Sequence, residues 1–188
     1  MLTICEGLDK TGKSTFIRQH VGNMYHEITE VCGFDILNPE RKISVLEQLS
    51  SIDETVILPA IGLHSDSTDE TPFETMMKCI ELSKHCDLYL DRSYISEVVY
   101  GRVFRGKSRI NDAQFTTLLM KLHELPHIIL YFKRTLDMTY RNALDNHDLF
   151  EDYKKLTLVR NEYAKVMTTL KRFNLNVYEI TMTIRGGK

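Results

Sequence analysis

The sequence of 188 residues lacks the features that mark several other classes of protein. No apolar run approaches the roughly 18 residues that a membrane-spanning helix needs. A strand-like run begins at Leu2, which leaves no room for a signal peptide. The net charge is only −2, so no global basic field attracts nucleic acid or an anionic membrane, although a local basic patch remains allowed. We therefore expect a protein of the cytoplasm with no membrane partner.

Cysteine is scarce and shows no metal-binding pattern. The cysteines are Cys5, Cys32, Cys79 and Cys86, and no two of them have C-x-x-C spacing. Because paired histidines at metal-ligand spacing are also missing, these residues do not indicate a zinc site. Reduced thiols are the default in the cytoplasm, and Cys5 is most simply a small buried hydrophobic residue.

Internal repeats, low-complexity tracts and linkers rich in proline or glycine are absent, which predicts a single domain over residues 1–188. Strand-like apolar runs alternate with helical stretches along the chain. The expected strands are Leu2–Cys5, Asp87–Leu90, His127–Phe132 and Asn176–Ile180. The expected helices are Lys13–Asn23, Arg41–Ser51, Pro72–His85, Ile95–Phe104, Asp112–Glu124, Leu136–Ala143 and Phe150–Phe173. This alternation predicts an α/β fold with a parallel β-sheet flanked by helices on both faces.

One apolar segment, Val56–Ile61, fits neither pattern. Pro59 weakens a helix there and equally a central strand, so the sequence leaves this structure open. The residues that follow, His64–Glu70, are polar and acidic and are typical of a solvated loop.

The most informative stretch is Gly7–Ser14, whose sequence GLDKTGKS matches the pattern G-x-x-x-x-G-K-[ST] at every position. A strand before it and a helix after it would build a phosphate cradle, because glycines let the backbone wrap closely and successive N–H groups point at the anion. Lys13 then reaches the β- and γ-phosphates, and the Ser14 hydroxyl ligates Mg²⁺. The sequence therefore predicts a site for ATP and Mg²⁺; a glycine turn that binds nothing is the alternative.

A second pair of charged residues, Asp91 and Arg92, follows the expected strand Asp87–Leu90. Ligands bind at the carboxyl ends of the strands in open parallel sheets, so this pair should lie near the mouth of the glycine loop. A carboxylate there can hold Mg²⁺ or its water shell, and a guanidinium can grip a second phosphate. The alternative is a surface ion pair, which would stabilise the protein little.

Several segments resemble thymidylate kinases, in the order in which that family has them. They are EGLDKTGKST at Glu6–Thr15, NPER at Asn38–Arg41, DRSYIS with VY at Asp91–Tyr100, PHIILYF at Pro126–Phe132 and DLFE at Asp148–Glu151. The resemblance spans residues 2–151 and implies a P-loop kinase fold like that of the nucleoside monophosphate kinases, with a short lid at residues 141–150.

The resemblance also implies roles for the matching residues. The ATP site would comprise Gly7, Asp9, Thr11, Gly12, Lys13, Ser14, Thr15 and Arg141, with Arg141 over the adenine, while Ser14 and Asp91 hold Mg²⁺. The acceptor site would comprise Asp9 on the sugar hydroxyl, Arg41 and Arg92 on the phosphate, Phe73 on the base, and Ser96 and Tyr100. Lys13, Lys10, Asp91 and Arg92 would be the catalytic residues. Lys10 stands where some members have an arginine and would offset charge as a point charge.

The sequence departs from the family pattern mainly around the acceptor. Leu149 replaces the arginine of the lid-end motif, and Met77 stands where an arginine would read the pyrimidine carbonyl. Ser93 replaces the aromatic residue after Asp-Arg, and Gly101 replaces the usual glutamine. The Asp-Arg-Ser form also resembles deoxynucleoside kinases, which share the fold and phosphorylate a hydroxyl.

Three functions therefore stay open. The leading hypothesis is ATP- and Mg²⁺-dependent phosphoryl transfer to a deoxynucleoside monophosphate, with a pyrimidine such as dTMP as the small-molecule partner. The second is transfer to a hydroxyl of a deoxynucleoside or of a 5-hydroxymethyl pyrimidine in DNA, with Glu6 or Asp91 as the general base. The third is an ATP-binding regulator without catalysis. A homodimer is a further expectation, by analogy with the fold family alone.

A basic cluster follows the Asp-Arg strand and consists of Arg102, Arg105, Lys107 and Arg109. A solvated basic face is the simple interpretation. The alternative is an extra phosphate contact, on a polyphosphorylated nucleotide or on a polynucleotide backbone.

Overall fold

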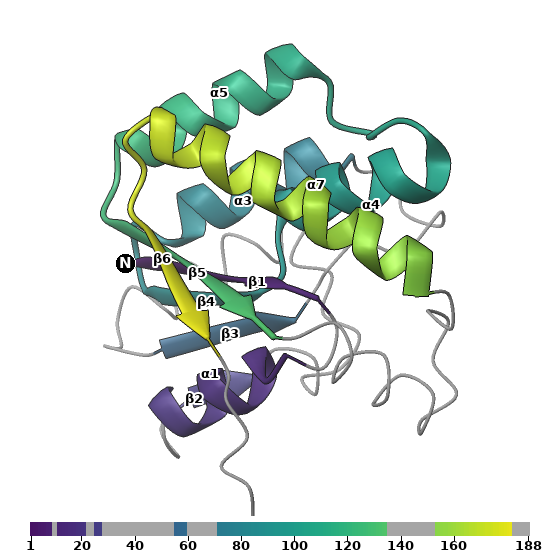
Figure 1. Cartoon of the computed structure of the whole chain (residues 1–188). Helices are drawn as coiled ribbons and strands as arrows, with labels where there is room; N and C mark the ends of the chain where they lie inside the picture. Colours follow the sequence, from purple (N-terminus) through teal and green to yellow (C-terminus); the bar gives the residue numbers. More distant parts are fainter. Residues whose placement is uncertain (9–10, 22–24, 28–54, 60–70, 135–152, 182–188) are drawn as a thin grey trace, which may run out of the picture.

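The computed structural model of the chain describes residues 1–8, 11–21, 25–27, 55–59, 71–134 and 153–181 (Figure 1). The expected helices Arg41–Ser51 and Leu136–Ala143 lie outside these residues, as does the expected lid at 141–150. The loop His64–Glu70 lies outside them too.

The centre of the fold is a six-stranded sheet with the order β2-β3-β4-β1-β5-β6. Every pair of neighbouring strands runs parallel. The strands are β1 (Leu2–Gly7), β2 (Tyr25–Glu27), β3 (Thr55–Pro59), β4 (Asp87–Asp91), β5 (His127–Lys133) and β6 (Val177–Thr181). Strand β1 lies between β4 and β5, so the glycine loop leaves the middle of the sheet.

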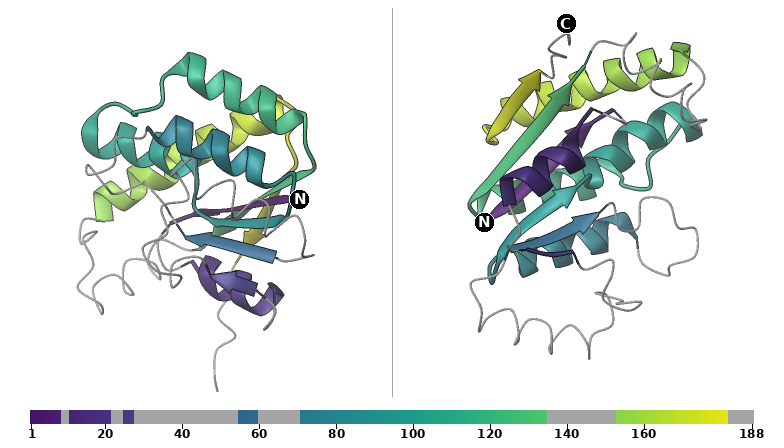
Figure 2. Two further views of the ribbon diagram at one scale, coloured as in Figure 1. Left: turned by 180° about the vertical axis from the view of Figure 1, so that it is seen from behind. Right: turned by 90° about the horizontal axis from the view of Figure 1, so that it is seen from below.

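Helices cover both faces of the sheet, which confirms the predicted α/β architecture. They are α1 (Lys13–Val21), α3 (Pro72–Leu82), α4 (Tyr94–Arg105), α5 (Asp112–His123) and α7 (Tyr153–Arg172). Helices α3, α4, α5 and α7 lie on one face, and α1 lies on the other (Figures 1 and 2). None of the helices in the described part of the chain could span a membrane.

The segment that the sequence left open forms β3, an interior strand of the sheet. Pro59 is its last residue and pairs with Asp91 of β4. The described part of β2 pairs only with Thr55–Ile57, so the missing N–H of the proline removes no hydrogen bond from that ladder. Strand β2 itself, with the sequence YHE, has no apolar run and was not expected from the sequence.

The core has a part on each side of the sheet, as the continuous burial of β1 requires. Leu2 and Ile4 join the large cluster under α3, α4, α5 and α7. Cys5 is fully buried in a smaller cluster with Ile17 of α1 and Phe132 of β5, which confirms its expected role as a small hydrophobic residue. Burial raises the pKa of the Cys79 thiol to about 12, and the described residues contain no group of three or more potential metal ligands.

Candidate active site

Two glycines of the loop occupy positions that other residues could not easily take. Gly7 has φ of +139°, and a Cβ atom on it would collide with the carbonyl oxygen of Phe132 in the neighbouring strand. Gly12 has φ of +88°, in the left-handed region that favours glycine. The glycines of the motif are therefore required by the backbone angles of the loop and, at Gly7, also by the neighbouring strand. Helix α1 begins directly after the second glycine, where Phe16 donates its N–H to the Gly12 carbonyl at 2.9 Å.

Lys13 lies inside the loop and is only 5% exposed. Its Nζ donates to the carbonyl oxygens of Leu8 at 2.7 Å and Gly7 at 3.3 Å. Thr11 donates its hydroxyl to the same Leu8 carbonyl at 2.8 Å. The ammonium group thus braces the loop and adds positive charge at the N-terminus of α1, where anions are favoured. Thr15 is exposed in the first turn of this helix.

The two expected Mg²⁺ ligands lie together, although 77 residues separate them in the chain. Ser14 donates its Oγ hydrogen to Oδ2 of Asp91. The strand register explains the meeting, since Asp91 pairs with Cys5 of β1 and both strands end at the same edge of the sheet. A hydroxyl and a carboxylate are hard oxygen donors, and Mg²⁺ typically takes one or two protein ligands together with waters and substrate phosphates. These two residues therefore fit Mg²⁺ bound with a nucleotide.

Arg92 follows at once and has a strained backbone with φ of +77°. A left-handed conformation costs a non-glycine residue about 1–3 kcal/mol, so surrounding contacts must hold it. Its N–H donates to the Cys5 carbonyl at 3.0 Å, and its guanidinium lies 5.2 Å from the ring centre of Tyr100. Its Nη1 donates to Ser96 Oγ at 3.2 Å and to Tyr163 OH at 3.4 Å. The guanidinium is thereby fixed beside the glycine loop.

Glu6, the last residue before the loop glycine, is fully buried. Its Oε1 accepts from the N–H and the hydroxyl of Ser93, both at 2.7 Å. Its Oε2 accepts from Ser96 Oγ at 2.6 Å and Tyr163 OH at 3.1 Å. Burial raises the pKa of Glu6, against the opposing effect of the hydrogen bonds from Ser96 and Ser93 and of the Arg92 charge. Both carboxylate oxygens are therefore engaged by the protein itself.

The remaining expected site residues divide into two groups. Phe73 lies on α3, partly buried against the large core cluster, and its contact with a base stays a prediction. Asp9, Lys10, Arg41 and Arg141 lie outside the described residues. The structure adds Tyr163, which the sequence did not single out because it looks like one more core residue of a long helix.

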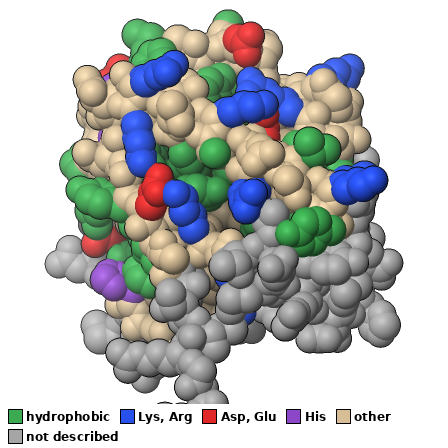
Figure 3. All heavy atoms as spheres, viewed as in Figure 1, with side chains coloured by type: hydrophobic (Ala, Val, Ile, Leu, Met, Phe, Trp, Pro, Cys, Tyr) green, Lys and Arg blue, Asp and Glu red, His purple; other side chains and the backbone are tan. Residues whose placement is uncertain are grey.

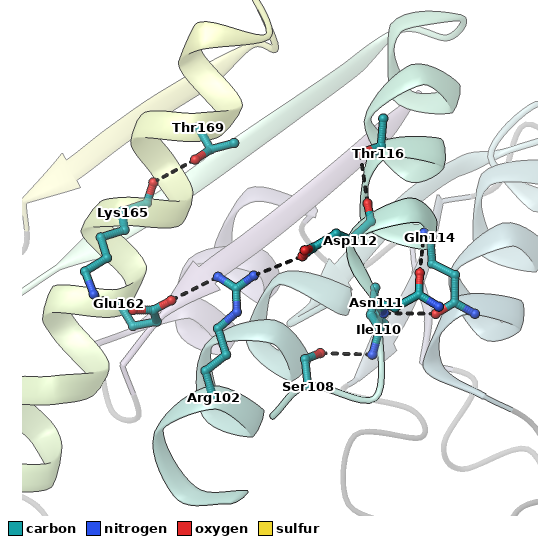
Figure 4. Close-up of polar contacts among 10 residues, drawn as sticks. All are labelled: Arg102, Ser108, Ile110, Asn111, Asp112, Gln114, Thr116, Glu162, Lys165 and Thr169. Atoms are coloured by element: carbon teal, nitrogen blue, oxygen red, sulfur yellow. Dashed lines mark hydrogen bonds and ion pairs between the residues drawn. The ribbon is translucent and has the colours of Figure 1, made fainter. Parts of the chain in front are cut away.

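Three arginines of the basic cluster bind carboxylates within the protein. Arg102 reaches from α4 to Glu162 of α7 at 3.0 Å and to Asp112 of α5 at 3.8 Å (Figure 4). Arg105 and Arg109 both pair with the buried carboxylate of Glu97. Over the face shown in Figure 3, lysine and arginine side chains are spread among hydrophobic and acidic ones. These contacts favour a structural role for the three arginines over the extra phosphate contact.

Comparison with known proteins identifies the fold. No protein-family model matches the sequence, and no curated protein matches it either. The YorR protein of Bacillus subtilis, solved with phosphorylated GDP, superposes with a TM-score of 0.63 at 19% identity, over 96% of this chain and 85% of that one. This chain has the fold of the P-loop nucleotide kinases.

Weaker structural matches come from two kinases. A deoxyadenosine kinase of M. mycoides with bound dCTP has a TM-score of 0.49 at 12% identity, over 96% of this chain and 90% of that chain. A thymidylate kinase of Ehrlichia chaffeensis has a TM-score of 0.43 at 13% identity, over 98% and 88% of the two chains.

Proposed function

We propose that this P-loop protein is a kinase that transfers the γ-phosphoryl group of ATP, with Mg²⁺, to a deoxynucleoside monophosphate. The observation that carries the proposal is the contact between Ser14 and Asp91, because it joins a loop hydroxyl and a strand-end carboxylate at the mouth of a phosphate cradle. Neither residue alone would indicate metal-assisted transfer. The phosphorylated GDP in the YorR structure, which has the same fold, agrees with a nucleotide ligand.

The reaction requires that the enzyme position the reactants and stabilise the charge of the transition state, and it requires no covalent intermediate with the protein. An oxygen of the acceptor phosphate would form a bond to the γ-phosphorus while the bond to the β–γ bridging oxygen breaks, and ADP leaves. Ser14 and Asp91 would hold Mg²⁺, which would neutralise charge on the phosphate oxygens. The loop N–H groups and Lys13 would hold the donor phosphates, and Arg92 would hold the acceptor phosphate by a charge-assisted pair.

The surroundings of the two candidate bases favour a monophosphate over a neutral hydroxyl as the acceptor. Asp91 already accepts from the Ser14 hydroxyl and would hold Mg²⁺. A hydroxyl acceptor would benefit from a general base that can reach it. Glu6 has no exposed surface, and its oxygens already accept from Ser93, Ser96 and Tyr163. A phosphate oxygen is already charged and needs no such base. The resemblance to thymidylate kinases supports a pyrimidine nucleotide such as dTMP as the acceptor.

The first test measures ADP production from Mg-ATP against separate acceptors. The panel contains the four deoxynucleoside monophosphates, their nucleosides, and a DNA duplex with and without hydroxymethylated pyrimidines. We expect turnover with a monophosphate. Turnover with a nucleoside or the modified duplex alone would move the acceptor to a hydroxyl, and ATP binding without any turnover would leave a nucleotide-binding regulator.

Two variants test whether Ser14 and Asp91 hold the metal. Ser14→Ala and Asp91→Asn should each raise the Mg²⁺ concentration for half-maximal rate by about tenfold or more, because each removes an oxygen donor from the metal. Asp87→Asn is the matched control, since Asp87 lies at the opposite end of the same strand and binds the N-terminal amine at 2.8 Å. Unchanged Mg²⁺ dependence in both site variants would overturn the assignment of the metal ligands.

A further inference from the structure

We propose that Tyr163 of α7 is a positioning residue for the acceptor, because its hydroxyl fixes the Arg92 guanidinium that binds the acceptor phosphate. The proposal rests on the proposed function and adds to it a residue 71 positions from Arg92 in the chain. Tyr163 itself is fully buried, so it acts through Arg92.

The tyrosine hydroxyl is the meeting point of three polar side chains. It lies 2.8 Å from Ser96 Oγ, 3.1 Å from Glu6 Oε2 and 3.4 Å from Arg92 Nη1. These partners come from β1, from the start of α4 and from the strained residue between β4 and α4. One hydroxyl from a distant helix therefore links the end of β1 to the residues that follow β4.

The hydrogens available satisfy this arrangement. Ser96 Oγ uses its hydrogen on Glu6 at 2.6 Å. Tyr163 can then give its hydrogen to Glu6 or to Ser96, and the two hydrogens on Arg92 Nη1 go to Ser96 and Tyr163. The Tyr163 hydroxyl oxygen thus accepts a hydrogen bond from the Arg92 guanidinium, and a phenylalanine ring at this position would offer no such oxygen.

The position of the hydroxyl is fixed by the packing of α7. The Tyr163 ring stacks on Tyr131 with 5.6 Å between ring centres and meets Tyr100 edge-on at 6.2 Å. The preceding residue, Glu162, pairs with Arg102 of α4 (Figure 4). A buried hydroxyl on a packed helix limits the rotamers of Arg92, so that less side-chain entropy is lost when Arg92 binds a ligand.

The test replaces Tyr163 by phenylalanine, which keeps the ring packing and removes only the hydroxyl. With one hydrogen bond lost, worth about 0.5–1.5 kcal/mol, the KM for the acceptor monophosphate should rise about two- to twelvefold. The KM for ATP should stay unchanged, because Arg92 serves the acceptor. A merely structural role would move both constants or neither, so this split separates positioning from stability.

Tyr94→Phe is the matched control. Tyr94 is also a buried tyrosine, but its hydroxyl has no hydrogen-bond partner among the described residues, and its ring packs against Phe115 of α5. This variant should leave both KM values unchanged. The melting temperatures of both variants are recorded alongside, and an acceptor KM that follows the melting temperature would overturn the positioning role.

A double-mutant cycle shows whether Tyr163 acts through Arg92. Arg92→Lys removes the fork that Tyr163 and Ser96 hold, so adding Tyr163→Phe to it should raise the acceptor KM no further. An equal further rise, or an unchanged acceptor KM in the single variant, would overturn the inference while leaving an active kinase. A wild-type protein that transfers phosphate to none of the acceptors would overturn the proposed function, and this inference with it.

Discussion

The buried carboxylate of Glu97 offers a quantitative test of what the basic cluster does. Glu97 is 2% exposed on α4. Its Oε1 accepts the backbone N–H of Arg109 at 2.9 Å and a bond from Arg105, and its Oε2 accepts from Arg109 Nη2 at 2.9 Å. One side chain therefore ties the end of α4 to the loop that leads into α5.

Glu97→Gln keeps the shape and one carbonyl oxygen but removes the charge and turns a donor toward the arginines. Each hydrogen bond to a charged group is worth about 1.5–3 kcal/mol, and the partly exposed arginines can recover some of it from water. We therefore expect the free energy of unfolding to fall by about 2–3 kcal/mol at pH 7. For a chain of this size the melting temperature should drop by about 4–12 °C.

The loss should depend on pH in a direction that the structure sets. Burial alone would raise the pKa of Glu97, but hydrogen bonds from Arg109 and Arg105 outweigh it and hold the pKa below its ordinary value of 4.5. A lowered pKa in the folded state stabilises the protein above that value, and the stabilisation is lost as the pH falls through the folded pKa. The gap between wild type and Glu97→Gln should thus be widest at neutral pH and narrow below about pH 4.5.

Urea denaturation at a series of pH values measures this gap. Glu124→Gln is the control, because Glu124 is 60% exposed and pairs with Lys121 at 2.7 Å on the surface. Such a pair contributes about 0.2–1 kcal/mol. If Glu97→Gln costs no more than this control, or if its cost is the same at every pH, the arginines do not depend on Glu97 and the structural interpretation of the cluster is wrong.

Three further substitutions test the loop and helix α4. Gly7→Ala should abolish ATP binding in a titration, because its Cβ would strike the Phe132 carbonyl at a positive φ. Gly101→Ala should lower the free energy of unfolding by about 1–3 kcal/mol in urea, since the added Cβ would lie 2.9 Å from Ser108 Cα; a neutral effect would mean that the loop yields. Lys13→Ala should lower kcat by at least about a hundredfold while circular dichroism stays native, and an unchanged rate would refute the role of the loop.

The contact at Gly101 also explains a departure from the thymidylate kinase pattern. A side chain there would meet the backbone of Lys107 and Ser108, so the glutamine usual in the family has no space. The sequence showed the departure but gave no reason for it, because the reason lies in a loop that turns back on the helix.

The glycine loop and the sheet could be predicted from the sequence because short segments of the chain indicate them. The loop motif itself requires glycine, since Gly7 and Gly12 have positive φ angles, and the burial of β1 and of the central residues of β4 leaves apolar runs in the sequence. Strand β2 escaped prediction for the opposite reason. Its three residues form a strand through pairing with β3, and no pattern within them indicates it.

The sequence by itself determined that this chain has a phosphate loop on a parallel α/β sheet, because both depend on short stretches whose backbone angles and apolar periodicity are set locally. Only the tertiary structure decided that Tyr163 meets Glu6 across 157 residues and that Glu97 takes up Arg105 and Arg109. The sequence of a basic segment does not show whether its positive charge faces water, binds a phosphate or pairs with a buried carboxylate. The packing of α4 against α7 and against its own loop supplies the partners, and with them the roles of these residues.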